Sequence, residues 1–326
     1  MTNLNVFTGF DVSKEFFDFC VIYDDETQCS HRLDYTSQGL KKLLAIIPAG
    51  CHCVMEATGP YYLRLACWLF DHGFIVSVIN PLVIRRFCQM KLLRAKTDKA
   101  DAKMIALYGK TEKPQSWQPP KEYLIKLQQL DSITELLTKN RSAFSNQLQA
   151  FETTGMMDAF TRAFLKNAIA TTEKKLQQVQ KEVAEIIEKH HKQMLEDVVS
   201  IPGIGKKSAI VLIVVSGAFS RFKNYKQLSS YLGISPRIFQ SGTSIKGRSR
   251  ICKLGMSRIR ALLYVCAWSA KKCNQACKEL YDRLVEKGKS KRLALIAVAN
   301  KLIKQAFTIA TTGVKYVPGY KKEICF

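Results

Sequence analysis

The chain of 326 residues is long enough for two or three domains, and 47% of its residues are hydrophobic, as in proteins that bury a core. Its longest apolar run, Ala209 to Val215, is too short to cross a bilayer. Residues 1–10 lack the basic and apolar segments of a secretory signal. We therefore expect a cytoplasmic protein whose eleven cysteines are reduced. The formal net charge of +23 is unusually high and indicates a polyanionic partner.

This positive charge is concentrated in the last third of the sequence. Residues 1–110 carry a net charge of +2, residues 111–197 a net charge of 0, and residues 198–326 a net charge of +21. No acidic residue occurs from Val198 to Lys278, whereas 15 basic residues do. Such a surface binds nucleic-acid phosphates through the release of counterions. The alternative is a solvated basic face kept for solubility, but faces of that kind usually mix both signs.

The first region alternates strand and helix patterns. Residues 5–12 and 16–24 are apolar segments separated by a short polar turn, which predicts two adjacent strands. Further strands are predicted at residues 51–57 and 74–80, and helices at residues 37–47, 59–73 and 97–110. Ser37 and Thr97 are candidate N-caps of the first and last of these helices. The alternation predicts an α/β fold with a mixed sheet.

Residues 120–197 have the periodicity of long helices. Apolar residues recur at steps of three and four: Leu124, Leu127, Leu130, Ile133 and Leu137. The pattern breaks near Gly155 and then resumes, which predicts two long helices folded back on each other. Their balanced charge is typical of a coiled-coil spacer. The pair would serve either as a dimerisation arm or as an intramolecular hairpin packed on the rest of the chain.

The third region opens with the segment SIPGIGKKSAIVLI, residues 200–213. Two helices joined by a Gly-x-Gly turn can direct backbone N–H groups at a phosphate, and the dipole of the second helix adds to the attraction. Lys206 and Lys207 follow this turn directly. The segment therefore predicts a helix-hairpin-helix element that binds DNA.

Four carboxylates of the first region lie at the ends of predicted elements. Asp11 ends the first strand and Glu56 ends a later one, while Asp98 and Asp101 share one face at the start of a helix. Such groups can converge at one edge of a sheet, where oxygen ligands suit Mg²⁺ ions that assist phosphodiester transfer. Taken singly, Asp11 could begin a turn, Glu56 could cap a helix, and the aspartates could interact with a helix dipole.

Two pairs of cysteines have spacings that half of a zinc site would have. Cys51 and Cys53 flank His52 in a predicted strand, and Cys273 and Cys277 are one helical turn apart. No matching second half of a zinc site is evident for either pair. Core or surface thiols are therefore the favoured interpretation.

Six motifs follow one another along the chain: GFDVSKEFFDFCV, MEATGPYY, VINP, RAKTDKADAKMIA, IPGIGKKSA and SGTSIKGRSRICKLGMSRIR. Together, from Phe7 to about Tyr264, they resemble the transposases of insertion sequences related to the Piv DNA invertase. The resemblance implies a RuvC-like domain of ribonuclease H fold over residues 1–112 and a helical coiled-coil or dimerisation region over residues 120–197. It implies a mostly helical, basic transposase domain over residues 198–326.

The resemblance also implies a chemistry and a set of partners. The family's Asp-Glu-Asp-Asp tetrad, which is taken to bind Mg²⁺, matches Asp11, Glu56, Asp98 and Asp101. Family members act on DNA as oligomers. For this chain the resemblance implies a dimer or a tetramer in the cytoplasm of a bacterium or an archaeon. They use a structured noncoding RNA, the bridge RNA, which pairs with target and donor DNA, so that base pairing selects the sequence.

The family's nucleophile matches Ser241, in the Ser-Gly pair of the last motif. Ser244 and Ser249 are rival candidates, but Gly242 beside Ser241 permits a close approach of the backbone. All three could instead be loop serines that bind phosphate. The candidates for contacts with nucleic acid are Lys206, Lys207, Arg237, Lys246, Arg248, Arg250, Lys253, Arg258 and Arg260.

Three other functions compete with a serine recombinase. The first motif also resembles the phosphate hairpin of actin-like sugar kinases, but no second phosphate loop follows and a kinase has no use for the basic region. A junction resolvase-type nuclease would use the four carboxylates with water as the nucleophile. A non-catalytic nucleic-acid-binding protein would need neither the tetrad nor the Ser-Gly pair, and both are intact.

Overall fold

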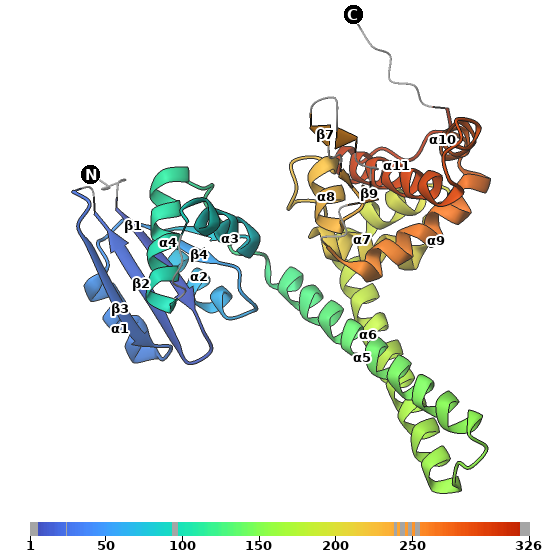
Figure 1. Ribbon diagram of the computed structural model, residues 1–326, viewed down its shortest axis with the longest axis horizontal. Helices are drawn as coiled ribbons and strands as arrows, with labels where there is room; N and C mark the ends of the chain where they lie inside the picture. The colour runs from blue at the N-terminus through green and yellow to red at the C-terminus, as the bar shows by residue number, and fades with distance from the viewer. Residues whose placement is uncertain are drawn as a thin grey trace, which may run out of the picture. The chain divides into compact units, whose positions relative to one another are not determined.

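The computed structural model describes residues 6–23, 25–92, 97–237, 240–241, 245–246, 250–251 and 255–319. The chain forms two compact units, Met1–Pro120 and Lys121–Phe326 (Figure 1). The further division of the second unit at residue 198 stays a prediction.

The first unit is built on a five-stranded sheet with the order β3-β2-β1-β4-β5. Its strands are β1 (Phe7–Val12), β2 (Phe16–Ile22), β3 (Gln28–Asp34), β4 (His52–Glu56) and β5 (Ile75–Ile79). Strands β1, β2 and β3 pair antiparallel, whereas β4 pairs parallel with both β1 and β5. This is the strand order of ribonuclease H-like folds, so the predicted α/β class with a mixed sheet is confirmed.

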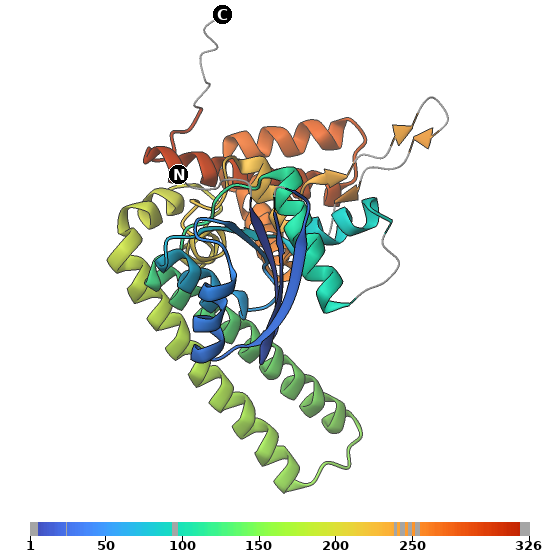
Figure 2. The same ribbon diagram turned by 90° about the vertical axis from the view of Figure 1, so that its left-hand side faces the viewer.

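Helices cover both faces of this sheet (Figures 1 and 2). They are α1 (Ser37–Ile46), α2 (Tyr62–Asp71), α3 (Pro81–Met90) and α4 (Asp98–Glu112). On one face, α1 and α2 enclose Phe10, Phe17 and Phe19, which are fully buried. On the other face, α4 packs across β1, β2 and β4. The two faces of the sheet therefore differ, and α4 defines the face on which the candidate site lies.

Two details of the predicted helices can be compared with the structure. Thr97 caps α4 as predicted, because its side chain accepts a hydrogen bond from the backbone N–H of Ala100. Ser37 as the cap of α1 is wrong by one residue, since Thr36 accepts the bond from the N–H of Gly39. Strand β3 and helix α3 were not predicted. Pro81 directly follows the strand predicted at residues 74–80 and opens α3, where its missing N–H costs nothing.

The second unit is helical apart from four two-residue strands in the described part of the chain. Helices α5 (Glu122–Thr153) and α6 (Ala159–Val199) pack against each other, which confirms the predicted pair of long helices. The later elements are α7 (Lys206–Ser216), α8 (Tyr225–Leu232), β6 (Pro236–Arg237), β7 (Gln240–Ser241), β8 (Ile245–Lys246), β9 (Arg250–Ile251), α9 (Ser257–Cys273), α10 (Gln275–Glu286) and α11 (Lys291–Thr312). A dimerisation role for α5 and α6 stays a prediction.

Helix α11 is long and apolar enough to cross a membrane by length and composition. Its apolar residues, however, are part of the core of the second unit, where Val298, Leu302 and Ile303 are fully buried. Helices α9 and α10 pack against it. These contacts identify α11 as a core helix of this unit.

Candidate active site

A row of charged residues crosses four strands on the face of the sheet that α4 covers. Asp11 of β1 lies directly opposite Asp18 of β2, and Asp18 lies opposite Arg32 of β3. Glu56 ends β4, one residue beyond the pair formed by Met55 and Phe10. Residues that are directly opposite on neighbouring strands share a face of the sheet. The order across the sheet is therefore Glu56, Asp11, Asp18 and Arg32.

Helix α4 brings two further carboxylates to this row. Gly9 lies two residues before Asp11 on β1 and so faces the same helix. A Cβ atom at Gly9 would lie 2.2 Å from the backbone nitrogen of Ala106, so only glycine permits this approach of helix and strand. Asp98 and Asp101 occupy the first turn of α4. The close contact at Gly9 thus positions both aspartates beside the row.

The electrostatics of Asp11 show that these carboxylates share one environment. Burial, together with the negative charges of Asp101, Asp98, Glu56 and Asp18, raises the pKa of Asp11 to about 6. Like charges disfavour a further ionised carboxylate in their midst, and burial adds to the effect. The other three predicted acids, Glu56, Asp98 and Asp101, are thus close enough to Asp11 to raise its pKa, and so is Asp18, which was not predicted.

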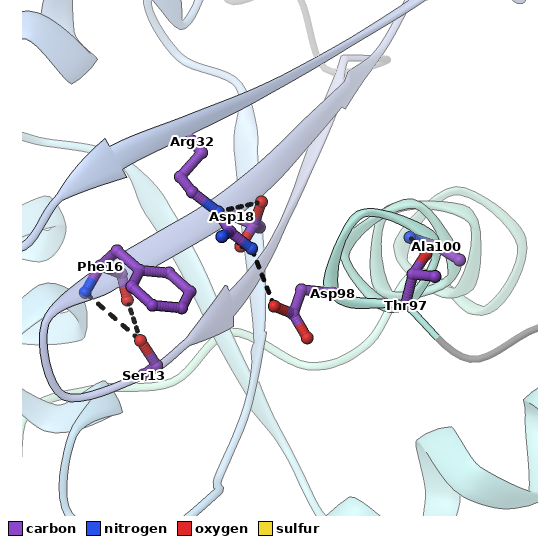
Figure 3. A network of polar contacts seen from close by, with 7 residues as sticks. All are labelled: Ser13, Phe16, Asp18, Arg32, Thr97, Asp98 and Ala100. Carbon is purple, nitrogen blue, oxygen red and sulfur yellow. Dashed lines mark hydrogen bonds and ion pairs between the residues drawn. The ribbon is translucent and has the colours of Figure 1, made fainter.

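Arg32 is the cation of this acidic row (Figure 3). Its Nε donates to both carboxylate oxygens of Asp18 at 3.1 Å, and its Nη2 donates to Oδ2 of Asp18 at 2.8 Å. The same Nη2 lies 2.8 Å from Oδ2 of Asp98. The guanidinium also lies over the ring of Phe16, 4.1 Å from its centroid. One side chain thus joins β2 and β3 to the first residue of α4.

Neither Asp18 nor Arg32 was predicted to be part of the site. Asp18 is a buried acid within the apolar strand β2, and an acid at such a position requires a partner. That signal was present in the sequence. Arg32 carried no comparable signal, because strand β3 was not predicted and its residues alternate between exposed and half-buried positions.

The chemistry of the donors fits a hard divalent cation, because the four charged groups that raise the pKa of Asp11 all offer carboxylate oxygen. Among the described residues, no three His, Cys, Asp or Glu side chains are gathered closely enough to hold one ion. Glu56 Oε1 accepts a bond of 2.7 Å from Thr58, and Asp98 contacts Arg32. Carboxylates without a cation between them repel one another, so an ion would have to draw these groups together.

The cysteine pairs have ordinary roles in the part of the chain that the structure describes. Cys51 and Cys53 are buried beneath the sheet, with their sulfur atoms 3.8 Å apart. The ring of His52 lies on the other side, 2.7 Å from the hydroxyl of Ser77. Cys277 is buried and Cys273 is exposed. The structure thus offers no support for half of a zinc site.

The predicted nucleophile lies in the second unit. The backbone of Ser241 forms part of β7 and pairs with Ile245 of β8, while its side chain lies outside the described part of the structure. The rival candidates Ser244 and Ser249 lie outside the described residues, as does Gly242.

The predicted helix-hairpin-helix segment forms a tight turn between α6 and α7. Gly203 has a φ of +102°, and a Cβ atom there would lie 2.5 Å from that of Ala270, so this position requires glycine. Lys206 and Lys207 begin α7 and are exposed. Lys206 forms an ion pair of 2.7 Å with Glu188.

The structure describes only some of the other side chains that were predicted to contact nucleic acid. Arg258 forms an ion pair with Asp131 that ties α9 to α5, and Nη1 of Arg260 donates to the carbonyl of Leu232 at 3.4 Å. Three further candidates are described only in their backbones: Arg237 in β6, Lys246 in β8 and Arg250 in β9. Arg248 and Lys253 lie outside the described residues.

A sheet of ribonuclease H order with carboxylates clustered on one face is typical of enzymes that act on nucleic-acid phosphodiesters with a divalent metal. Comparison with family models agrees with this class. Residues 8–154 match a transposase model for the N-terminal part of these enzymes, and residues 196–282 match the model "Transposase IS116/IS110/IS902 family". The chain belongs to this family of transposases, which cleave and rejoin DNA. The N-terminal model implies a divalent metal.

Individual relatives agree with this assignment. The chain is 32% identical to the pilin gene-inverting protein of Moraxella bovis, over 93% of this chain and 95% of that protein. The corresponding protein of Moraxella lacunata matches with the same identity and coverage. A protein of insertion element IS110 from Streptomyces coelicolor is 31% identical over 36% of this chain and 29% of its own length.

Proposed function

We propose that this protein is the recombinase of a mobile insertion sequence and uses Ser241 as its nucleophile. A divalent metal, Mg²⁺, is bound by Asp11, Glu56, Asp98 and Asp101. The observation that carries this proposal is the convergence of carboxylates that raises the pKa of Asp11 to about 6. Several negative charges close enough to raise the pKa of one carboxyl are typical of a functional site, and carboxylate oxygens suit a cation.

The reaction begins when Oγ of Ser241 attacks a DNA phosphorus. The Oγ–P bond forms as the bond from phosphorus to one deoxyribose oxygen breaks. The serine proton passes to solvent, and the leaving oxygen takes up a proton to become a hydroxyl. After strand exchange, a deoxyribose hydroxyl attacks the phosphoserine and regenerates both the phosphodiester and Ser241. No ATP is needed, because the covalent link conserves the bond energy of the phosphodiester.

The side chains have separate tasks in this scheme. A serine hydroxyl is a poor nucleophile until it is activated. When bound, the metal supplies positive charge to the oxygens of the transferring phosphate. The basic residues of the second unit bind the DNA backbone and stabilise the charge that develops on the phosphate. The turn before Lys206 and Lys207 acts as a helix-hairpin-helix element in this binding.

The remaining parts of the proposal concern partners. A noncoding bridge RNA selects target and donor DNA by base pairing, and the acid-free stretch from Val198 to Lys278 binds its backbone as well as that of DNA. The protein acts as a homo-oligomer in the cytoplasm. Helices α5 and α6 are the proposed dimerisation arm.

A covalent-trapping assay tests the chemistry. The protein is co-expressed with the noncoding RNA that flanks its gene, mixed with labelled element-end DNA and Mg²⁺, and run on a denaturing gel. Wild type should give a protein–DNA adduct that is absent from the Ser241→Ala and Asp11→Asn variants. Cleavage without an adduct, persisting in Ser241→Ala, would instead identify a nuclease that uses water. In that case Ser241 would be a phosphate-binding residue.

A further inference from the structure

Arg32 has no role in the chemistry proposed above, yet it contacts the acidic row at two points. It is paired with Asp18, whose side chain is only 2% exposed, and with Asp98, whose side chain is 55% exposed. A buried carboxylate and a solvated one are therefore joined by a single guanidinium. Figure 3 shows this bridge between the sheet and the start of α4.

We propose that Arg32, anchored on Asp18, is a positioning residue that holds the Asp98 carboxylate ready to bind the metal. This inference rests on the metal site of the proposed function. It assigns a task to two residues, Asp18 and Arg32, that lie outside the predicted tetrad.

Several contacts hold the guanidinium of Arg32 at once. Asp18 accepts three hydrogen bonds from Arg32, at 3.1, 3.1 and 2.8 Å, which is the geometry of a two-pronged carboxylate–arginine pair. The ring of Phe16 covers one face of the guanidinium. The pairing of β2 with β3 places Asp18 and Arg32 directly opposite each other. The position of Nη2 is thus set by the sheet itself.

Asp98 needs such an anchor because of where it lies. It is the first residue of α4, and its side chain has solvent on more than half of its surface. The neighbouring negative charge of Asp11 favours rotation of the Asp98 carboxylate away from the site. The bond from Arg32 engages Oδ2 and holds the group against this repulsion. Carboxylates that bind metals are commonly held in this way, and loss of the holding residue typically costs 10- to 100-fold in metal affinity.

The opposite effect is also physically possible, and it gives the test two clear outcomes. Arg32 is a cation close to the metal position, so it could compete with the metal for Asp98. If competition dominated, removing Arg32 would strengthen metal binding. If positioning dominates, as we propose, removing Arg32 weakens it.

The experiment is a calorimetric titration of the full chain with Mn²⁺, without nucleic acid. Arg32→Gln should bind Mn²⁺ about 10- to 100-fold more weakly than wild type. Arg32→Lys should recover part of this loss, because it keeps the charge but not the two-pronged geometry. The matched control is Arg64→Gln, which removes a guanidinium lying over the ring of Tyr35 and should leave the affinity unchanged.

A second variant guards against simple unfolding. Arg32→Gln leaves Asp18 buried without its partner, so the sheet could be destabilised. The double variant Asp18→Asn with Arg32→Gln removes both charges and should melt near the wild-type temperature. It should still bind Mn²⁺ about 10- to 100-fold more weakly, an effect that a purely structural role of Arg32 does not produce.

Each remaining outcome has a definite meaning. If the double variant folds and binds Mn²⁺ as tightly as wild type, or more tightly, the positioning role is overturned while the metal site stands. If wild type and Asp11→Asn bind Mn²⁺ with equal affinity, the metal site itself is wrong, and the role of Arg32 fails with it.

Discussion

The two units of this protein carry their functional signals in different forms. Residues 1–120 contain 14 Lys and Arg against 12 Asp and Glu, so their charge is nearly balanced. Residues 121–326 contain 36 Lys and Arg against 15 Asp and Glu. In the first unit the relevant acids are scattered in sequence and gathered by strand pairing and by the approach of α4. In the second unit the positive charge is visible in the composition alone.

This difference separates two kinds of function. A site that depends on backbone register is sensitive to one misplaced carboxylate or one added methyl group. A basic surface that binds phosphates is a sum of many similar contacts, and each of them contributes little. Substitutions in the acidic row should therefore abolish chemistry and leave binding intact, whereas single substitutions of basic residues in the second unit should weaken binding slightly.

The largest effect is expected from removing one group on each side of this comparison. Asp11→Asn and Ser241→Ala should each lower recombination by about 10³-fold or more, since each removes a group that acts in the transition state. DNA affinity, measured by a gel shift, should change less than about twofold, because neither variant alters the basic surface. A large loss of affinity in either variant would contradict the separation of chemistry from binding.

Substitutions at the same two residues also test whether active sites are shared between protomers. The carboxylates and the serine belong to different units. One protomer could therefore supply the carboxylates, and another protomer the serine, to a common active site. A mixed oligomer of Asp11→Ala and Ser241→Ala protomers should then regain part of the wild-type recombination. No recovery at all, in mixtures shown to form hetero-oligomers, would mean that each protomer builds its own site.

A smaller effect is expected from a methyl group at the contact of β1 and α4. Gly9→Ala places a Cβ 2.2 Å from the nitrogen of Ala106 and 2.4 Å from the carbonyl oxygen of Ala102. The helix must move, at a cost of about 2–3 kcal/mol in the free energy of unfolding. Recombination should fall further than the stability loss explains, because Asp98 and Asp101 move with α4.

The second unit offers a matched control for this substitution. Nothing lies within 4 Å of a Cβ built at Gly205, the residue that precedes α7. Gly205→Ala should cost less than about 1 kcal/mol, which is the loss expected at a helix cap. Urea denaturation of both variants gives the comparison. Equal losses would show that the close approach at Gly9 is not a constraint.

The raised pKa of Asp11 predicts an effect of pH on the free energy of unfolding. The pKa is about 6 in the folded protein against an ordinary value of 3.8, so between these values the folded state holds a proton that the unfolded state has lost. The stability from this group is present below about pH 3.8 and is lost as the pH rises through about 6. After allowance for the partial exposure of Asp11, the loss should be about 2 kcal/mol.

Denaturation in the presence of a chelator measures this loss. Asp11→Asn cannot ionise, so wild type should become less stable than this variant as the pH rises from 4 to 7. The two proteins should differ little at pH 4. Parallel stability curves for wild type and variant across this range would show that Asp11 has an ordinary pKa.

The sequence predicted the first unit to the extent that its signals were local. The mixed sheet, the cap Thr97, the position of Glu56 at the end of β4 and that of Asp11 one residue before the end of β1 follow from patterns of a few residues. Strand β3 was missed because exposed and half-buried residues alternate along it and no fully buried residue marks it as a strand. Without β3, Arg32 had no assigned position, and the partner of the buried Asp18 could not be inferred.

Register and tertiary contact explain the other limits of the sequence. The pairing of Asp11 with Asp18 depends on the hairpin register, and the approach of α4 depends on Gly9 meeting Ala106. Neither the register nor the helix approach can be inferred from a short segment of the sequence. In the second unit, the long helices followed from periodicity, whereas the ion pair between Arg258 and Asp131 joins residues far apart in the chain. Arg258 therefore has a structural partner that its position in a basic motif did not indicate.

The smallest effect is expected at two neighbouring lysines of the basic surface. Lys206 and Lys207 both begin α7, but only Lys206 forms an ion pair with Glu188, at 2.7 Å. The charge of Lys206 is partly balanced in the free protein, so Lys207 should release more counterion on binding DNA. Lys207→Gln should lower the magnitude of the slope of log affinity against log salt by about 1, and Lys206→Gln should lower it by less. Gel shifts between about 50 and 200 mM salt measure both slopes. Two unchanged slopes would place the DNA backbone away from the start of α7, and the helix-hairpin-helix assignment would then fail while the chemistry of the first unit stood.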